Sequence, residues 1–293
     1  MAGQLKEVRN RIKSVQSTQQ ITKAMKMVSA AKLRRATDAI VQMRPYAKKL
    51  QEMLSNIVSS SEGDSSVSLA VERPVEKVLM IVITSDRGLA GAFNTNVIKL
   101  TKATIAERYS EQFRKGNVTI WNIGKKGYEH FTKNNYKTDA THKDIFLRLT
   151  FENVQLASQA AMKAFEEGKF DVVEIVYSQF KNAATQRFEV ERFLPIPKVE
   201  RKAGAGNANF IFDPSQAELV AELMPKILNT QLYKAILDSN ASEHGARMTA
   251  MDKASENANE MLRNLKISYN RARQAAITTE LTEIVSGAAA LQG

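Results

Sequence analysis

The chain of 293 residues has no cysteine, which excludes disulfides, thiol catalysis and thiolate metal sites. It has only three histidines, and no two of them lie at the i, i+4 spacing of a helical metal site, so no metal ligand set is expected. The longest apolar run, residues 78–83, is far too short to cross a bilayer. The close acid pairs in the middle of the chain, 166/167 and 189/191, have no matching histidine, so no catalytic acid–base pair and no cofactor site are predicted.

Glycine and proline are almost missing from both ends of the chain. Between Gln4 and Ser61 there is no glycine and a single proline, Pro45. Between Ala241 and Leu291 there are two glycines and no proline. Both stretches are rich in good helix formers, which predicts two long helices. At 1.5 Å per residue each would be roughly 80–90 Å long.

The apolar spacing of the two ends suggests that they pair. In the N-terminal stretch apolar residues recur every three or four positions, as in an imperfect coiled coil with a slip near Gln19. The predicted seam is Leu5, Val8, Ile12, Val15, Ile21, Met25 (with Ala24), Val28 and Ala31. The inner positions of the C-terminal stretch are small or slim, so a partner helix can come close: Ala241, Gly245, Met248, Ala254 or Ser255, Ala258, Leu262, Leu265, Ala272 and Ala276.

The positive charge of the chain is concentrated at its N-terminus. The net charge is +11, and residues 1–50 contain twelve Lys or Arg but only Glu7 and Asp38 as acids. A face that serves solubility alone usually mixes both signs. This basic helix is therefore expected to meet nucleic acid, anionic lipid or an acidic protein surface.

The middle of the chain has the composition of a compact α/β domain. All twelve phenylalanines and Trp121 lie between Phe93 and Phe212. Strands are predicted at 77–84, 118–123, 171–177 and 187–193, the last one antiparallel at an edge, with helices at 93–115 and 151–167. The order predicts a Rossmann-like domain with a small, mostly parallel sheet.

Polar segments separate this domain from the two ends. Residues 59–76 and 195–212 are predicted linkers. Asp213 and Pro214 predict a helix start, and Pro225 predicts either a new segment or a kink. The expected fold is an α/β protein with an antiparallel coiled coil of the N- and C-terminal helices, and the expected division is 1–61, 75–195 and 213–293.

Two glycine-containing turns lie where nucleotide loops occur in other proteins. The turn 85–91 follows the first strand, but it lacks the G-x-G-x-x-G pattern, and no acidic residue ends the second strand. The segment 124–127 could cradle a phosphate, although a plain helix start with a solvated pair of lysines explains it better. Nucleotide binding is not predicted.

The last helix ends in an unusual way. A polar collar that includes Arg273, Gln274 and Thr278 is followed by an apolar tip with Leu281, Ile284, Val285 and Leu291. Chain ends are usually frayed and polar. An apolar helical end predicts that another protein surrounds it.

Three motifs together resemble one family, the gamma subunit of F-type ATP synthase. The C-terminal pattern Ile277-Thr278-x-Glu280-x-x-Glu283-x-x-x-Gly287-Ala288-x-Ala290 resembles its signature. The segments 12–32 (IKSVQSTQQITKAMKMVSAAK) and 84–89 (TSDRGL) are similar to the same family. The resemblance runs from end to end.

The resemblance implies a non-catalytic central rotor that couples ion-driven rotation to ATP synthesis or hydrolysis in a ring of alpha and beta subunits. Arg273, Gln274 and Thr278 would contact catch loops of the ring, and Met25 and Lys26 its acidic lever loop. Leu281, Ile284, Val285 and Leu291 would lie in the upper bearing. The middle domain would adjoin the epsilon subunit and the membrane c-ring.

The resemblance also bears on subtype and location. The chloroplast branch carries a cysteine-bearing insert, and this chain has no cysteine. With no presequence before Met1, we expect a bacterial protein on the cytoplasmic face of the inner membrane, peripheral to it. Two alternatives remain, a nucleic-acid binder and a nucleotide-dependent enzyme. The first leaves the apolar tip unexplained and lacks stacking aromatics in its helices.

Overall fold

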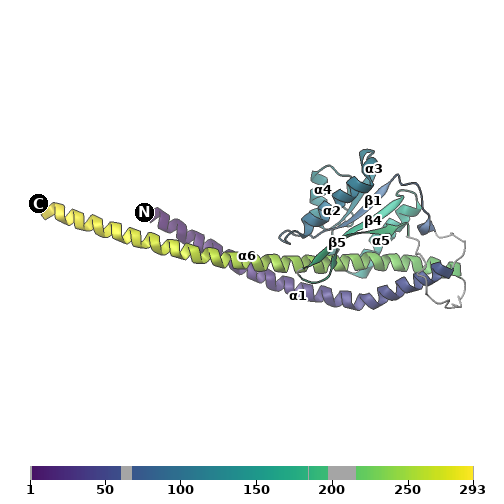
Figure 1. Cartoon of the computed structure of the whole chain (residues 1–293), viewed down its shortest axis with the longest axis horizontal. Helices are drawn as coiled ribbons and strands as arrows, with labels where there is room; N and C mark the ends of the chain where they lie inside the picture. Colours follow the sequence, from purple (N-terminus) through teal and green to yellow (C-terminus); the bar gives the residue numbers. More distant parts are fainter. Residues whose placement is uncertain (1, 61–67, 184, 197–215, 293) are drawn as a thin grey trace. The chain divides into compact units, whose positions relative to one another are not determined.

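The structure is a computed structural model and describes residues 2–60, 68–183, 185–196 and 216–292 (Figure 1). The chain divides into two compact units, which are described separately. Unit 1 comprises Met1–Ser29 and Arg247–Gly293, and unit 2 comprises Ala30–Ala246. The predicted helix start at residues 213–214, residues 61–67 of the first predicted linker and residues 197–212 of the second lie outside the described residues.

Unit 2 contains a five-stranded sheet in the order β3-β2-β1-β4-β5. Its strands are β1 (Val78–Ile83), β2 (Val118–Ile123), β3 (Thr138–Asp139), β4 (Val172–Phe180) and β5 (Gln186–Leu194). The pairs β1–β2, β1–β4 and β2–β3 are parallel, and β5 is antiparallel to β4. This confirms the predicted mostly parallel sheet and its antiparallel edge strand. The short strand β3 was not predicted.

Helices cover both faces of this sheet (Figure 1). They are α2 (Phe93–Arg108), α3 (Ser110–Arg114), α4 (Lys125–Lys133) and α5 (Phe151–Glu166), with short 3-10 turns at Ser68–Ala70 and Ile145–Arg148. Alternate residues of β1 point to opposite faces. Val78 and Val82 pack with Val97 of α2. The predicted helix over 93–115 is interrupted at Tyr109, whose φ of −132° lies outside the helical range, although its amide still donates to the Ile105 carbonyl oxygen at 3.0 Å.

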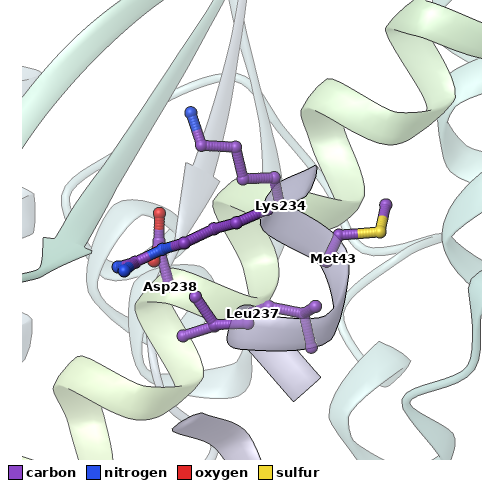
Figure 2. Close-up of a pocket in the computed structure, with 6 residues that line it drawn as sticks. Met43, Lys234, Leu237 and Asp238 are labelled. Atoms are coloured by element: carbon purple, nitrogen blue, oxygen red, sulfur yellow. The ribbon is translucent and has the colours of Figure 1, made fainter. Parts of the chain in front are cut away.

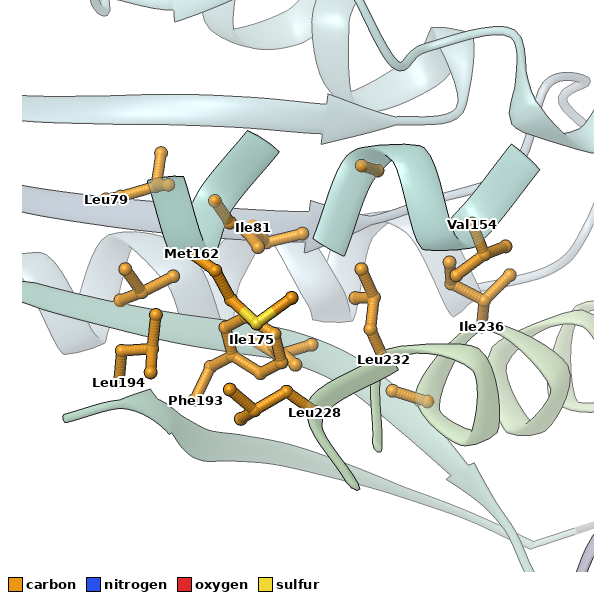
Figure 3. Packing of buried hydrophobic residues seen from close by; sticks show 14 of the residues in the cluster. Leu79, Ile81, Val154, Met162, Ile175, Phe193, Leu194, Leu228, Leu232 and Ile236 are labelled. Carbon is orange, nitrogen blue, oxygen red and sulfur yellow. The ribbon is translucent and has the colours of Figure 1, made fainter. Parts of the chain in front are cut away.

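The opposite face of the sheet packs against α5 and the last helix, α6 (Gln216–Gln292). Leu228, Leu232 and Ile236 of α6 join Ile81 of β1 and Phe193 of β5 in one buried cluster (Figure 3). Pro225 lies within α6, so no new helix begins there. Burial on both faces explains why β1 and most of β4 are apolar without alternation.

The first helix, α1 (Ala2–Ser60), pairs with α6 in both units. In unit 2, Ala36 and Ile40 of α1 pack against Leu237 and Ala241 of α6. In unit 1, hydrogen bonds join the two helices across the seam. The predicted pairing of the chain ends is confirmed. No helix in the described parts of the chain has the length and apolar character needed to cross a membrane.

Candidate functional site: the helix pair of unit 1

The seam between α1 and α6 in unit 1 is polar over three successive contacts. The Gln19 side-chain amide donates a hydrogen bond to Asn259 Oδ1. The hydroxyl groups of Thr22 and Ser255 are 2.7 Å apart. The Lys26 ammonium lies 2.5 Å from Asp252 Oδ1. These six residues are called the polar seam below: Gln19, Thr22 and Lys26 of α1, with Asn259, Ser255 and Asp252 of α6.

The polar seam shows that the predicted apolar seam was wrong in its second half. Ile21 and Val28 were expected inside, but they are 59% and 56% exposed. Thr22 and Ser29 are buried instead. The three- and four-residue spacing continues from Val15 through 19, 22, 26 and 29 without a slip. Apolar spacing alone could not find this, because the seam residues there are polar.

Few apolar side chains are buried between the two helices of unit 1. Residues of unit 1 take no part in the clusters of buried hydrophobic side chains found in the described chain. Met251 and Ala258 are its buried apolar side chains, and Ile12, Val15, Leu262 and Leu265 are only half-buried. The buried apolar contact between the helices is therefore thin in unit 1, and directional polar contacts add to it.

The predicted collar residues lie on the exposed surface of α6. Arg273, Gln274 and Thr278 are all exposed, and the Thr278 hydroxyl donates a hydrogen bond to the Gln274 carbonyl oxygen at 3.0 Å. At a rise of 1.5 Å per residue the collar lies about 33 Å along α6 from Asp252. The structure therefore does not bring the collar together with Met25 and Lys26.

The two predicted lever-loop contacts differ in their surroundings. Met25 and Lys26 are both half-buried. The Lys26 ammonium is already paired with Asp252, a partner that the sequence analysis missed. The neighbouring Met27 is 68% exposed. The apolar surface available to a partner at this level is therefore made mainly by Ile21, Met27 and Val28.

The predicted tip is bare. Leu281, Ile284 and Val285 are 57%, 62% and 66% exposed. Leu291 belongs to α6, but its side chain is outside the described part of the structure. Three large aliphatic side chains exposed within five residues form an apolar patch, which marks an interaction surface.

The basic character predicted for the N-terminal helix lies on its surface. The exposed basic residues of α1 in unit 1 are Lys6, Arg9, Arg11, Lys13 and Lys23. The Arg9 guanidinium donates a hydrogen bond to the Tyr269 hydroxyl at 2.9 Å. The other four add positive charge to the outer surface, where an acidic partner can reach it.

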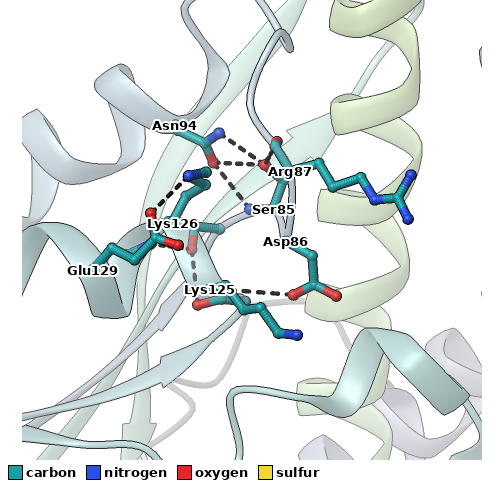
Figure 4. A network of polar contacts seen from close by, with 10 residues as sticks. Ser85, Asp86, Arg87, Asn94, Lys125, Lys126 and Glu129 are labelled. Carbon is teal, nitrogen blue, oxygen red and sulfur yellow. Dashed lines mark hydrogen bonds and ion pairs between the residues drawn. The ribbon is translucent and has the colours of Figure 1, made fainter. Parts of the chain in front are cut away.

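The glycine turns of unit 2 form a structural junction (Figure 4). The first amides of α4 are already satisfied: the Lys125 amide donates to Asp86 Oδ1 at 3.2 Å, and the Gly127 amide to Thr84 Oγ1 at 2.8 Å. The Lys126 amide donates to the Ser85 carbonyl oxygen at 3.0 Å. A phosphate at this helix end would have to displace all three contacts.

Two side-chain ion pairs flank the same helix start. The Lys126 ammonium lies 2.6 Å from Glu129, and the Lys125 ammonium lies 3.3 Å from Asp144. Burial raises the pKa of the Asp86 carboxyl, while the Lys125 amide hydrogen bond opposes that rise. Both lysines therefore have acidic partners within the chain, which agrees with a helix start rather than a phosphate site.

A buried carboxyl group lies between α1 and α6 in unit 2. Asp238 lines a small pocket with Ile40, Met43, Arg44, Lys234 and Leu237 (Figure 2). Burial raises the pKa of Asp238 to about 6, although Lys234 and Arg44 act in the opposite direction. Within the described residues, no three His, Asp or Glu side chains gather in a way that could hold a metal ion.

Comparison with known proteins gives matches over nearly the whole chain. A sequence model of the family described as ATP synthase matches residues 4–291. The ATP synthase gamma chain of Cytophaga hutchinsonii is 54% identical over 290 residues, which is 98% of each chain. That of Chlorobaculum tepidum is 48% identical over 290 residues, 98% of this chain and 99% of its own.

Solved structures give the same fold at lower identity. A chain in the Euglena gracilis mitochondrial ATP synthase OSCP/F1/c-ring structure has a TM-score of 0.67 and 20% identity, with coverage of 99% of this chain and 95% of that one. A chain in the rotor of the same enzyme has a TM-score of 0.63 at 20% identity and covers 94% of this chain. These likenesses confirm the fold of paired terminal helices with a mostly parallel sheet.

Proposed function

The chain belongs to the ATP synthase family, among its bacterial gamma chains, and from this premise we propose that it is the central rotor shaft of a proton-translocating F-type ATP synthase. Rotation driven by ion flow would be coupled through this shaft to ATP synthesis or hydrolysis in the alpha/beta ring. The observation that carries the proposal is the helix pair of unit 1, which has a polar seam and an exposed apolar tip. A slim helix pair of this kind suits the bore of a ring.

The tip is the part of the surface that most needs a partner. Leu281, Ile284 and Val285, together with Leu291, would lie in the upper bearing of the ring. Leu281, Ile284 and Val285 are each more than half exposed in the isolated chain, which supports this. Burying large aliphatic side chains is favourable by about 1.5–3 kcal/mol each.

The collar and the lever-loop contacts would transmit the coupling. Arg273, Gln274 and Thr278 are exposed donors and acceptors that a loop of the ring can reach. Met25 and Lys26 would meet the acidic lever loop of the beta subunit, and the exposed Ile21 and Val28 extend that surface. The basic residues of α1 would attract the acidic loop over a longer range.

Unit 2 would serve the lower end of the rotor, against the epsilon subunit and the c-ring. The chain would be peripheral to the membrane, on the cytoplasmic face of the bacterial inner membrane, and would bind no nucleic acid, cofactor or metal. Catalysis would belong to the ring alone. In the proposed division into 1–61, 75–195 and 213–293, the middle domain would make the lower contacts, and the parts of the two outer segments that form unit 1 would make the ring contacts.

The first experiment tests assembly. The alpha and beta subunits of the same organism are co-expressed with and without this chain, and the ATP hydrolysis of the purified product is measured. A stable complex with sustained hydrolysis that forms only when the chain is present supports the rotor function. Subunits that assemble and turn over equally well without it would refute the proposal.

The second experiment tests the collar. The double variant Arg273→Ala, Gln274→Ala should assemble, but it should lower ATP synthesis because it removes polar groups that hold the catch loops. A matched control is Arg263→Ala, Asn264→Ala, two exposed residues earlier on α6. Synthesis that is unchanged in the collar variant, or equally low in the control, would remove the collar from the mechanism.

A further inference from the structure

Helix α1 carries two stripes in unit 1, either of which could meet α6. The polar stripe, Gln19, Thr22 and Lys26, is the one in the seam. The apolar stripe contains Ile21 and Val28, which are seven residues apart and therefore on one face of the helix. Successive residues of a helix are about 100° apart, so a rotation of α1 by roughly that angle would exchange the two stripes.

Over residues 19–29 the hydrophobic effect alone favours the other arrangement, whereas Ile12 and Val15 before this stretch and Ala36 and Ile40 after it favour the observed one. Ile21 and Val28 are more than half exposed, although both are large aliphatic side chains at a spacing suited to a seam. Burying such side chains stabilises a helix pair more per residue than one neutral hydrogen bond does. Something in the chain must therefore oppose the rotation.

The polar seam supplies this opposition, because its contacts share one register. In each of the three contacts the two residue numbers add up to 277 or 278. The Arg9–Tyr269 contact follows the same rule. All of these contacts lie on one face of α1, so a rotation would break them together. Polar residues at seam positions are known to specify one pairing at a cost in stability.

We propose that Gln19, Thr22 and Lys26 are positioning residues that fix the rotation of α1 about its own axis. By pairing with α6 they keep Ile21 and Val28 pointing outward, where the alpha/beta ring can reach them. The benefit for coupling rests on the rotor function proposed above. The orientation itself is a property of this chain alone and can be measured without the ring.

The chain offers a clean reporter for this orientation because it has no cysteine. Val28→Cys places one thiol on the apolar stripe, where the native residue is 56% exposed. Ser29→Cys places one thiol in the seam, where the native residue is 3% exposed. The rate of maleimide labelling of each full-length single-cysteine protein then reports which stripe faces solvent.

The test variant replaces the α1 half of the polar seam: Gln19→Ala, Thr22→Ala and Lys26→Ala. Alanine favours helix, so the helix itself should persist. The matched control makes similar changes at exposed positions of the same helix: Gln16→Ala, Gln20→Ala and Lys23→Ala. Circular dichroism and the fluorescence of Trp121, which lies in unit 2, check that both proteins are folded.

In the unaltered background and in the control, the thiol at 28 should react quickly and the thiol at 29 slowly. In the test variant the order should reverse, with labelling at 28 slowed about fivefold as its exposure falls. Unchanged rates at both positions would overturn the proposal. Fast labelling at both would also overturn it, since the helices would then have separated rather than turned. Neither result depends on whether the chain assembles with a ring.

Discussion

The buried carboxyl of Asp238 gives a prediction whose size can be worked out. Its pKa rises from 3.8 to about 6 on folding because of burial. The folded state therefore holds the proton more tightly than the unfolded state does, and ionisation of this group destabilises the fold. The penalty develops as the pH rises from about 4 to 6 and is complete above that. Two pKa units correspond to about 3 kcal/mol, which is an upper limit.

The variant Asp238→Asn removes the charge but keeps an oxygen that can accept the hydrogen bond from the Phe180 amide. The variant should unfold at a higher urea concentration than the parent. Its free energy of unfolding should be higher by up to about 3 kcal/mol at pH 7.5 and by about half of that at pH 5. The variant also loses the attraction of the carboxylate to Lys234 and Arg44. The raised pKa already includes that attraction, so the predicted increase in the free energy of unfolding at neutral pH is a net value.

The assay is urea unfolding of the full chain at the two pH values, followed by circular dichroism. The matched control is Asp38→Asn, which changes an exposed aspartate of α1 and should give no comparable gain. A gain at Asp238 that is the same at pH 5 and pH 7.5 would refute the reasoning. A variant less stable than the parent at pH 7.5 would refute it too, because the carboxylate would then be stabilising.

Four further substitutions test the packing of the chain. Gly124→Ala should cost about 2–5 kcal/mol in urea unfolding, because its φ is 97° and the new methyl group would lie 2.1 Å from the Thr84 carbonyl oxygen. Gly287→Ala, whose methyl group would meet no atom within 4 Å, should instead gain up to about 1 kcal/mol of helix stability. Similar losses at both glycines would contradict this. Phe165→Ala should cost about 3–5 kcal/mol in the sheet domain, and a loss under 1 kcal/mol would show that the cluster is not tightly packed. Tyr177→Phe removes a 2.9 Å hydrogen bond to a carboxylate of β5 and should cost about 1–3 kcal/mol, unless water replaces the hydroxyl without loss.

The sheet could be predicted well because its strands carry strong local signals. Residues 78–83 are apolar throughout and buried on both faces, so the pattern of a central parallel strand matches its surroundings. The strand β3, by contrast, has only two residues and pairs through its backbone. A segment that short has no side-chain period to detect. The interruption at Tyr109 was also missed, because no glycine or proline in the sequence marks it.

The helix pair was predicted in outline, but its inner face was not. Spacing rules assume that the seam is apolar, and they therefore chose Ile21 and Val28. In the structure the choice depends on pairing between residues more than 200 positions apart, such as Thr22 with Ser255. Such pairing cannot be read from one helix alone. The exposed apolar tip was visible in the sequence because it breaks the usual polarity of a chain end.

The sequence separation of the helix contacts constrains the order in which the chain folds. The partners in the polar seam are 226–240 residues apart. Closing an unstructured loop of that size costs about 5 kcal/mol of chain entropy. Unit 2 removes most of this cost once it has folded, because contacts such as Ala36 with Ala241 bring the two helices together within it. The pairing in unit 1 should therefore be the last step.

During synthesis the first segment of α1 must then wait for its partner. At about 5–20 residues per second, the intervening chain takes on the order of 10–50 s to make. If the seam of this unpaired helix were apolar throughout, it would expose a continuous hydrophobic surface to which other unfolded chains could bind. Over this stretch the seam positions are polar and can be hydrated until α6 is made; they are Gln19, Thr22, Lys26 and Ser29. The side chains that we propose fix the orientation of the finished pair would thus also reduce the apolar area that its unfinished half exposes.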